Sequence, residues 1–185
     1  MKRVERSEIL DYVTYGERRD EVRASALQAK SERRILVGDY FTFLFENQET
    51  VRYQVQEMMR VERIVKEADI QHELDTYNEL IHEAGTVGCT LLIGIDDESE
   101  RDEKLQAWLG LNDHIYAEMP DGTRIKPTWD SRQVGDQRLS SVQYLIFAFG
   151  PEPPRAIGVG LDGAQAETAL SETQRDALRA DLQAD

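Results

Sequence analysis

Apolar residues in this chain follow a two-residue period, or form short continuous runs, in six stretches, which predicts six β-strands. Around Gly38-Asp39, two stretches lie close together, and the glycine supplies the positive φ of a two-residue hairpin turn. In the second stretch Phe41, Phe43 and Phe45 share one face, which is expected to point into the core. The strands are predicted at residues 34–37, 40–45, 86–95, 114–119, 123–126 and 141–149.

A helical period marks the segments between these strands. Asn47 and Thr50 are candidate N-caps for the longest helix, and Ser171-Glu172-Thr173-Gln174 has the spacing of a capping box. Gly88 and Gly94 keep one face of their strand thin, so a helix is expected to pack closely over that face. The helices are predicted at residues 17–34, 49–68, 70–82, 98–109 and about 171–182.

The elements do not alternate strictly and two connections are tight hairpins, which indicates an α+β fold. We expect a mainly antiparallel sheet of about five to six strands, packed with three to four helices, plus a short C-terminal helix. Residues 1–150 are predicted to form a single domain. Residues 151–185 are predicted to be a Pro/Gly-rich linker followed by an acidic helical tail.

Composition narrows the classes of function. The chain has 185 residues with 36 acidic and 22 basic side chains, a formal net charge of −14. Nucleic acid is therefore an unfavourable partner, because most of the surface would repel phosphate. No run of about 18 apolar residues predicts a membrane span, and the first residues carry no apolar signal segment. A cytoplasmic location away from membranes is expected.

The motifs that would indicate a metal or a cofactor are incomplete, so neither is predicted. Cys89 is the single cysteine, which excludes an internal disulfide or a multi-cysteine metal site. Gly158-Val159-Gly160-Leu161-Asp162-Gly163 matches a dinucleotide-binding pattern but leaves too little chain for the second strand. Thr76 stands where a zinc-protease helix starting at His72-Glu73 needs its second histidine. Glu79 and His82 give only one Glu-x-x-His motif, and a di-iron site needs two.

The longest predicted helix places a carboxylate within its apolar stripe. On a helical wheel Glu62 falls between Val51, Val55 and Val65, with Gln54 at the margin. A carboxylate facing a core needs a partner. One interpretation is a structural ion pair, with Arg23, Arg33 and Arg34 as the candidate partners. The alternative is a site for a metal, a polar ligand or proton transfer, to which the flanking Glu57 and Arg60 could contribute.

The first long helix carries a basic stripe that stands out in so acidic a chain. Its members are Arg19, Arg23, Lys30 and Arg34. Pairing with acidic residues of the same chain is one interpretation. An anionic ligand or an acidic patch on a partner is the other.

A set of residues at fixed spacings carries a family resemblance. The set comprises Lys30, Arg33, Arg34, Gly38, Thr42, Phe45, Glu46, Asn47, Thr50, Gln54, Gln56, Glu57, Met58, Arg60, Glu62, Glu73, Tyr77, Asn78, Leu80, Ile81, Ser140, Ser141, Val142, Tyr144 and Leu145. It resembles the bacterial DUF3501 family of proteins of unknown function. The resemblance covers about residues 5–150, and the tail after Pro154 is expected to be particular to this sequence. His82 stands where the family usually has proline.

The resemblance implies a context more than an activity. Such proteins are often encoded beside rubrerythrin-like and iron–sulfur oxidoreductase proteins, which implies a redox or oxidative-stress setting. The chain lacks the cysteines and paired motifs of a redox centre, so the resemblance implies an accessory protein with a rubrerythrin-like or iron–sulfur partner.

The leading hypothesis is therefore a binding protein for such a partner or for a small ligand. The rival hypothesis is a metal-dependent or carboxylate-using enzyme with Glu57 or Glu62 in the site, and homo-oligomer formation is a further alternative. The residues expected to bind the ligand or partner are Arg33, Arg34, Glu46, Asn47, Gln54, Glu57, Arg60, Glu62, Tyr77 and Asn78.

Overall fold

The computed structural model describes residues 1–184 and contains five α-helices, eight β-strands and three short 3-10 helices. The α-helices are α1 (Tyr12–Ser31), α2 (Gln48–Glu62), α3 (Glu67–Asn78), α4 (Glu98–Ala107) and α5 (Glu172–Gln183). The strands are β1 (Arg34–Val37), β2 (Phe41–Phe45), β3 (Thr86–Ile93), β4 (Ile115–Glu118), β5 (Arg124–Ile125), β6 (Val142–Ala148), β7 (Ala156–Val159) and β8 (Ala166–Ala169). The 3-10 helices are Arg6–Glu8, Leu111–His114 and Ser131–Gln133.

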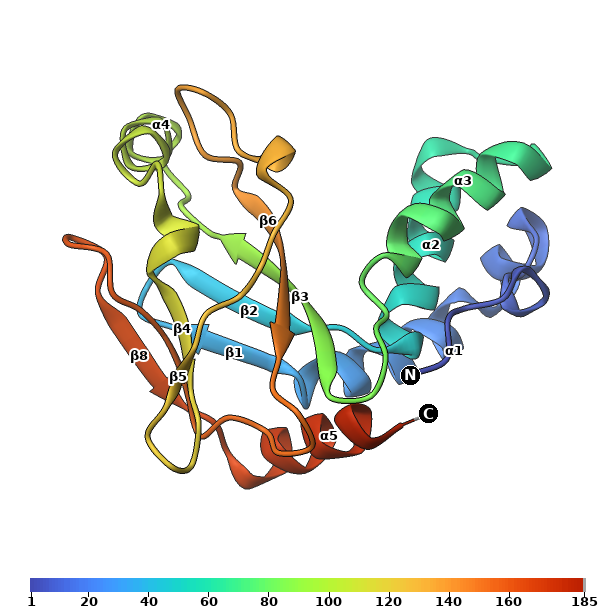
Figure 1. Cartoon of the computed structure of the whole chain (residues 1–185). Coiled ribbons are helices and arrows are strands. Elements are labelled where there is room, and N and C mark those ends of the chain that lie inside the picture. Colours follow the sequence, from blue (N-terminus) through green and yellow to red (C-terminus); the bar gives the residue numbers. More distant parts are fainter. Residues whose placement is uncertain (185) are drawn as a thin grey trace.

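The strands form two four-stranded antiparallel sheets that pack against each other (Figure 1). Sheet A has the order β1-β2-β3-β6, and sheet B has the order β5-β4-β7-β8. The α+β class and the antiparallel pairing are confirmed, with eight strands in two sheets where the sequence indicates one sheet of five to six. Phe41, Phe43 and Phe45 are at most 2% exposed and lie in the core between the sheets, as expected.

The C-terminal segment contributes directly to this core. Residues 156–169 supply β7 and β8 rather than the expected linker, and β7 pairs with β4 inside sheet B. The expected C-terminal helix is present as α5, and Leu178 and Leu182 bury its apolar side. Arg33 holds α5 in place from the other end of the chain, because its Nε lies 2.6 Å from Asp181 Oδ2.

Helices α1, α2 and α3 form a separate cluster beside the face of sheet A that points away from sheet B (Figure 1). The cluster has its own apolar core, built around Val51, Val55 and Met59 of α2. The end of α3 reaches sheet A at Gly88 of β3. A Cβ atom there would lie 2.3 Å from the carbonyl oxygen of Leu80, so the glycine permits this approach, as the thin face of the strand predicts.

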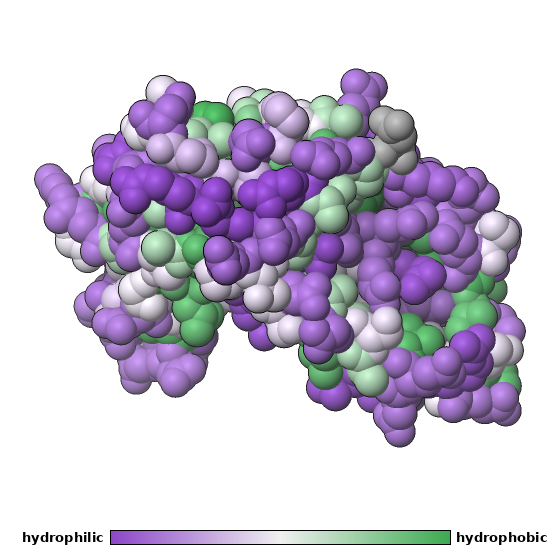
Figure 2. Space-filling view, turned by 90° about the horizontal axis from the view of Figure 1, so that it is seen from below, coloured by the Kyte–Doolittle hydropathy of each residue, from purple (hydrophilic) through white to green (hydrophobic). Residues whose placement is uncertain are grey.

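The surface of the molecule is mainly polar. Figure 2 shows one face covered largely by hydrophilic residues, with hydrophobic patches between them. Within residues 1–184, no helix is both long enough and apolar enough to cross a membrane.

Candidate functional site

One face of sheet A is only partly covered, and it carries polar and aromatic side chains in one row. The strand register pairs Arg34 with Leu44, Leu44 with Thr90, and Thr90 with Tyr144. Residues opposite each other in a sheet point to the same side, so these four side chains share the face toward the helices. Leu92 and Tyr144 on this face are 38% and 43% exposed. We call it the open face of sheet A.

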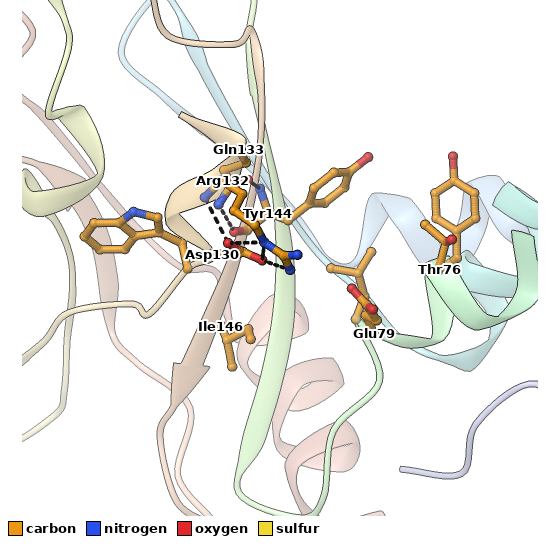
Figure 3. Close-up of a pocket in the computed structure, with 10 residues that line it drawn as sticks. Thr76, Glu79, Asp130, Arg132, Gln133, Tyr144 and Ile146 are labelled. Carbon is orange, nitrogen blue, oxygen red and sulfur yellow. Dashed lines mark hydrogen bonds and ion pairs between the residues drawn. The ribbon is translucent and has the colours of Figure 1, made fainter. Parts of the chain in front are cut away.

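A pocket of about 460 Å³ lies at the β6 side of the open face, between α3 and the connection that precedes β6. The connection is fastened to the edge of β6, where the side-chain amide of Gln133 donates to the carbonyl of Tyr144 at 2.9 Å and accepts from its N–H at 2.7 Å. Figure 3 shows Tyr144 extending from β6 toward α3. The pocket is lined by Thr76, Tyr77, Glu79, Leu80, Trp129, Asp130, Arg132, Gln133, Tyr144 and Ile146.

Glu46 is a buried carboxylate next to the open face, at the junction of β2 and α2. Its backbone N–H donates to the carbonyl of Gly88 at 2.8 Å, which continues the pairing of β2 with β3. Its side chain is almost fully buried and accepts hydrogen bonds from the hydroxyls of Thr90, at 2.7 Å, and Thr50. Among residues 1–184, no basic side chain forms an ion pair with this carboxylate. A buried carboxyl held only by hydroxyls is a candidate for a functional group.

Burial controls the protonation of Glu46 and of its nearest cation. Burial raises the pKa of Glu46, and the hydroxyls of Thr50 and Thr90 and the charge of Lys30 oppose the rise. Burial also lowers the pKa of Lys30, whose ammonium lies 5.0 Å from the centre of the Tyr53 ring. Both shifts bring the pKa values closer to neutral pH, which is the direction that proton transfer requires.

Two tyrosines connect Glu46 with the pocket. Burial raises the pKa of Tyr77 and of Tyr144, and the negative charge of Glu46 adds to both shifts. Gln54 lies beside Tyr77 and opposes the rise in its pKa. The structure therefore brings four of the expected site residues, Arg34, Glu46, Gln54 and Tyr77, to the same region.

Glu57 and Arg60 lie elsewhere, in an ion-pair cluster between α1 and α2. Glu57 accepts from the Tyr15 hydroxyl at 2.6 Å and from Arg19 Nε and Nη2 at 2.8 and 2.9 Å. Arg60 donates to the same carboxylate at 3.2 Å. The hydrogen bonds from Arg19 hold the pKa of Glu57 at about 2, so the group is ionised and fully engaged at neutral pH. These contacts favour a structural role in joining the two helices.

Glu62 does not face the core, so the expected inward carboxylate on α2 is wrong. It is the last residue of α2 and is exposed, and Val61 and Val65 beside it are exposed as well. Arg63, with a φ of 55°, ends the helix in the left-handed conformation. The helical wheel fails here because the helix stops where the pattern was extended. None of Arg23, Arg33 and Arg34 forms an ion pair with Glu62 within residues 1–184.

The other three expected residues hold the chain together. Arg33 is committed to Asp181. Asn47 caps α2, because its side chain accepts from the N–H of Thr50 at 3.0 Å. Asn78 binds the backbone of Val4 through two hydrogen bonds of 2.9 Å and so anchors the N-terminal segment to α3. Residue type alone does not distinguish such structural roles from ligand binding.

Several residues of the region were not among the expected site residues. Lys30 is predicted only as a member of the basic stripe and of the family-like set, and Thr90 only as a residue of the strand expected at residues 86–95. Trp129 and Arg132 lie in an irregular connection that carries no periodic signal. Tyr144 belongs to the family-like segment of the last main strand, and its alternation with buried neighbours could have identified it as outward-facing.

Comparison with known proteins places this architecture in a family. A family described as "Protein of unknown function (DUF3501)" matches residues 3–182. The chain belongs to the DUF3501 family. The match reaches the end of α5, so the segment after Pro154 is a family feature and its expected restriction to this sequence is wrong.

One solved structure resembles this DUF3501 protein over nearly its whole length. It is a protein of unknown function from Burkholderia pseudomallei K96243, with 25% sequence identity and a TM-score of 0.89. The similarity covers 98% of this chain and 100% of the other, so it includes both sheets and the helical cluster. A search of curated proteins finds no match.

Proposed function

We propose that this DUF3501 protein is a binding protein and that its site is the pocket between α3 and β6. One observation carries the proposal. Tyr77 and Tyr144, from elements far apart in sequence, line a hollow of about 460 Å³ on a sheet face that the fold covers only in part. A concave site with aromatic walls and a few polar groups is typical of ligand pockets.

The surroundings of the pocket support this assignment. Glu46 is buried, its charge acts on the two tyrosines, and its carboxylate is satisfied only by threonine hydroxyls. Keeping a carboxyl in such a place costs stability, because it loses its hydration without gaining an ion pair. The fold tolerates that cost beside the open face of sheet A, as expected where a polar group acts on a ligand.

The family resemblance adds a setting to this proposal. We infer an accessory role in a bacterial redox or oxidative-stress system, with a rubrerythrin-like or iron–sulfur protein as the partner. The state of Cys89 agrees with an accessory role, because this thiol is not suited to act as a redox group itself. It is completely buried, and burial raises the pKa of its thiol, so little reactive thiolate forms.

The binding function is tested by a fragment screen on the isolated protein. A mixed set of small neutral, cationic and anionic fragments is added to ¹⁵N-labelled protein, and amide shifts are followed by NMR. We expect fragments that change the amide shifts of both Tyr77 and Tyr144. These changes should be lost at Tyr77 in the Tyr144→Ala variant. A screen in which no fragment moves these residues would contradict the proposal. The partner is tested separately, by recovering rubrerythrin-like or iron–sulfur proteins with the native protein.

A second candidate function is an enzyme that uses Glu46 as an acid or base. The observation in its favour is the raised pKa of this buried carboxyl, on which the positive charge of Lys30 acts. Glu57 and Glu62, the residues expected for this role, are respectively ion-paired and exposed on α2. Glu46→Gln keeps the shape of the side chain, so loss of a turnover with binding retained would support the enzyme. If Glu46→Gln lost turnover and ligand binding to the same extent, the result would not support the enzyme.

A further inference from the structure

We propose that the pocket between α3 and β6 takes a small organic cation, namely an alkylated ammonium group. This inference rests on the proposed binding function and adds the chemistry of the ligand. It follows from the aromatic walls of the pocket, from the balance of charge around it and from its apolar floor.

Three aromatic residues line the pocket, and each comes from a different segment of the chain. Tyr77 comes from α3, Trp129 from the segment between β5 and β6, and Tyr144 from β6. The faces of such rings attract cations, and the attraction is stronger when the cation carries alkyl groups that shed water easily. Leu80 and Ile146 complete the lining with apolar surface that methyl or methylene groups can contact.

The charges around the pocket favour a positive ligand. Asp130 and Arg132 both line it but are already paired, with Arg132 Nε 2.8 Å from Asp130 Oδ2, so their charges largely cancel (Figure 3). Glu79 remains as a lining carboxylate that makes no ion pair within the described residues. Glu73 adds negative charge at Tyr77.

An anionic ligand fits this arrangement poorly. It would meet the carboxylate of Glu79, while Nε and Nη2 of Arg132 already bind Asp130. A neutral ligand could use the rings and the apolar floor but would gain nothing from the carboxylates. The three classes of ligand are therefore distinguished by charge, and a cation is the one that can use both the aromatic rings and the carboxylate of Glu79.

Three probes of nearly equal shape test the inference. Choline carries a quaternary ammonium, 3,3-dimethyl-1-butanol replaces its nitrogen by carbon, and 3,3-dimethylbutyrate carries a negative charge. Each is titrated into the full chain while amide shifts and tryptophan fluorescence are measured, and a Trp108→Phe variant isolates the signal of Trp129. We expect choline to bind at least about tenfold more tightly than the alcohol, and the carboxylate to bind most weakly.

Two variants and a matched control locate the effect. Tyr144→Leu should weaken choline binding about tenfold, and Glu79→Gln should weaken it about threefold while leaving the alcohol unaffected. Tyr12→Leu is the control, because Tyr12 on α1 is 40% exposed, close to the 43% of Tyr144, but does not line the pocket.

Equal or tighter binding of the alcohol or the carboxylate, or unchanged choline binding in Tyr144→Leu, would overturn the inference. If other fragments still move Tyr77 and Tyr144 in that case, the binding function survives and only the ligand class is wrong. If no probe or fragment moves them, both proposals fail.

Discussion

The hydroxyl of Thr90 donates a 2.7 Å hydrogen bond to the carboxylate of Glu46, and this contact joins the middle of sheet A to the start of the helical cluster. Thr90 lies on β3, whereas Glu46 follows β2 and precedes α2. The contact positions a buried acid at the edge of the open face. The chemistry of the site and the docking of the helices therefore depend on the same pair.

Glu46→Gln is expected to gain stability relative to the wild type as the pH rises. The pKa of Glu46 is raised in the folded protein above its usual value of 4.5, so the folded state binds more protons than the unfolded state above that pH. The wild type therefore loses stability as the pH rises from about 4.5 through the folded pKa, and glutamine cannot titrate. Urea unfolding at pH 4 and pH 7 measures the change in the difference between the two proteins.

The exposed Glu62→Gln serves as the control for the same substitution at the surface. A Glu46→Gln difference that does not change between pH 4 and pH 7 would show that burial does not raise the pKa of this carboxyl. Thr90→Val should raise the pKa of Glu46 further, because it removes a hydroxyl that favours the charged form.

Glu57→Gln is expected to destabilise the protein by about 1–2 kcal/mol at pH 7, since it weakens charge-assisted hydrogen bonds to Arg19 and Arg60. The pKa of Glu57 is lowered to about 2, so the wild type keeps this stabilisation above pH 4.5 and loses it as the pH falls toward 2. Glu62→Gln, on the same helix, should change stability by less than about 0.5 kcal/mol. If the two substitutions changed the stability equally, the ion-pair cluster around Glu57 would not contribute to the stability of the fold.

The contrast between Glu57 and Glu62 shows what the sequence could predict. Periodicity identified the long helix and the inward positions Val51 and Val55, because these residues fall within the regular part of α2. It failed at the end of the helix, where the left-handed Arg63 redirects the chain. Alternation likewise identified the inward phenylalanines of β2, because one face of that strand is wholly buried.

Contacts between distant segments could not be predicted in the same way. Nothing in the local pattern specifies that β7 and β8 join a second sheet, because short strands with small residues resemble linkers. Likewise, the partner of Arg33 lies 148 residues away, and the partner of Glu46 lies 44 residues away. The family-like set identified Glu46 as a candidate, but only the fold shows that it is buried without an ion pair.

Asp181→Ala is expected to destabilise the protein by about 3–5 kcal/mol, because it leaves the guanidinium of Arg33 buried without its partner. Asp176→Ala is the control on the same helix, since its contact with Arg179 is exposed and should contribute about 0–1 kcal/mol. Chemical unfolding followed by circular dichroism measures both variants. The double variant Arg33→Met, Asp181→Leu should recover much of the loss. Failure of Asp181→Ala to exceed the control would show that α5 is held by its leucines alone.

Gly88→Ala is expected to disturb both stability and the pocket. The new methyl group would lie 2.3 Å from the carbonyl oxygen of Leu80, so the end of α3 must move away from sheet A. Such overpacking costs about 1–3 kcal/mol, and the movement should displace Tyr77 from its place opposite Tyr144.

Gly94→Ala, just after the same strand, is the control, because its methyl group would be 4.0 Å from the nearest atom. It should be neutral or slightly stabilising, by up to about 1 kcal/mol. Unfolding measurements and choline titration of both variants then separate the two effects. Loss of stability with unchanged choline binding would mean that the pocket does not depend on how α3 is seated on the sheet.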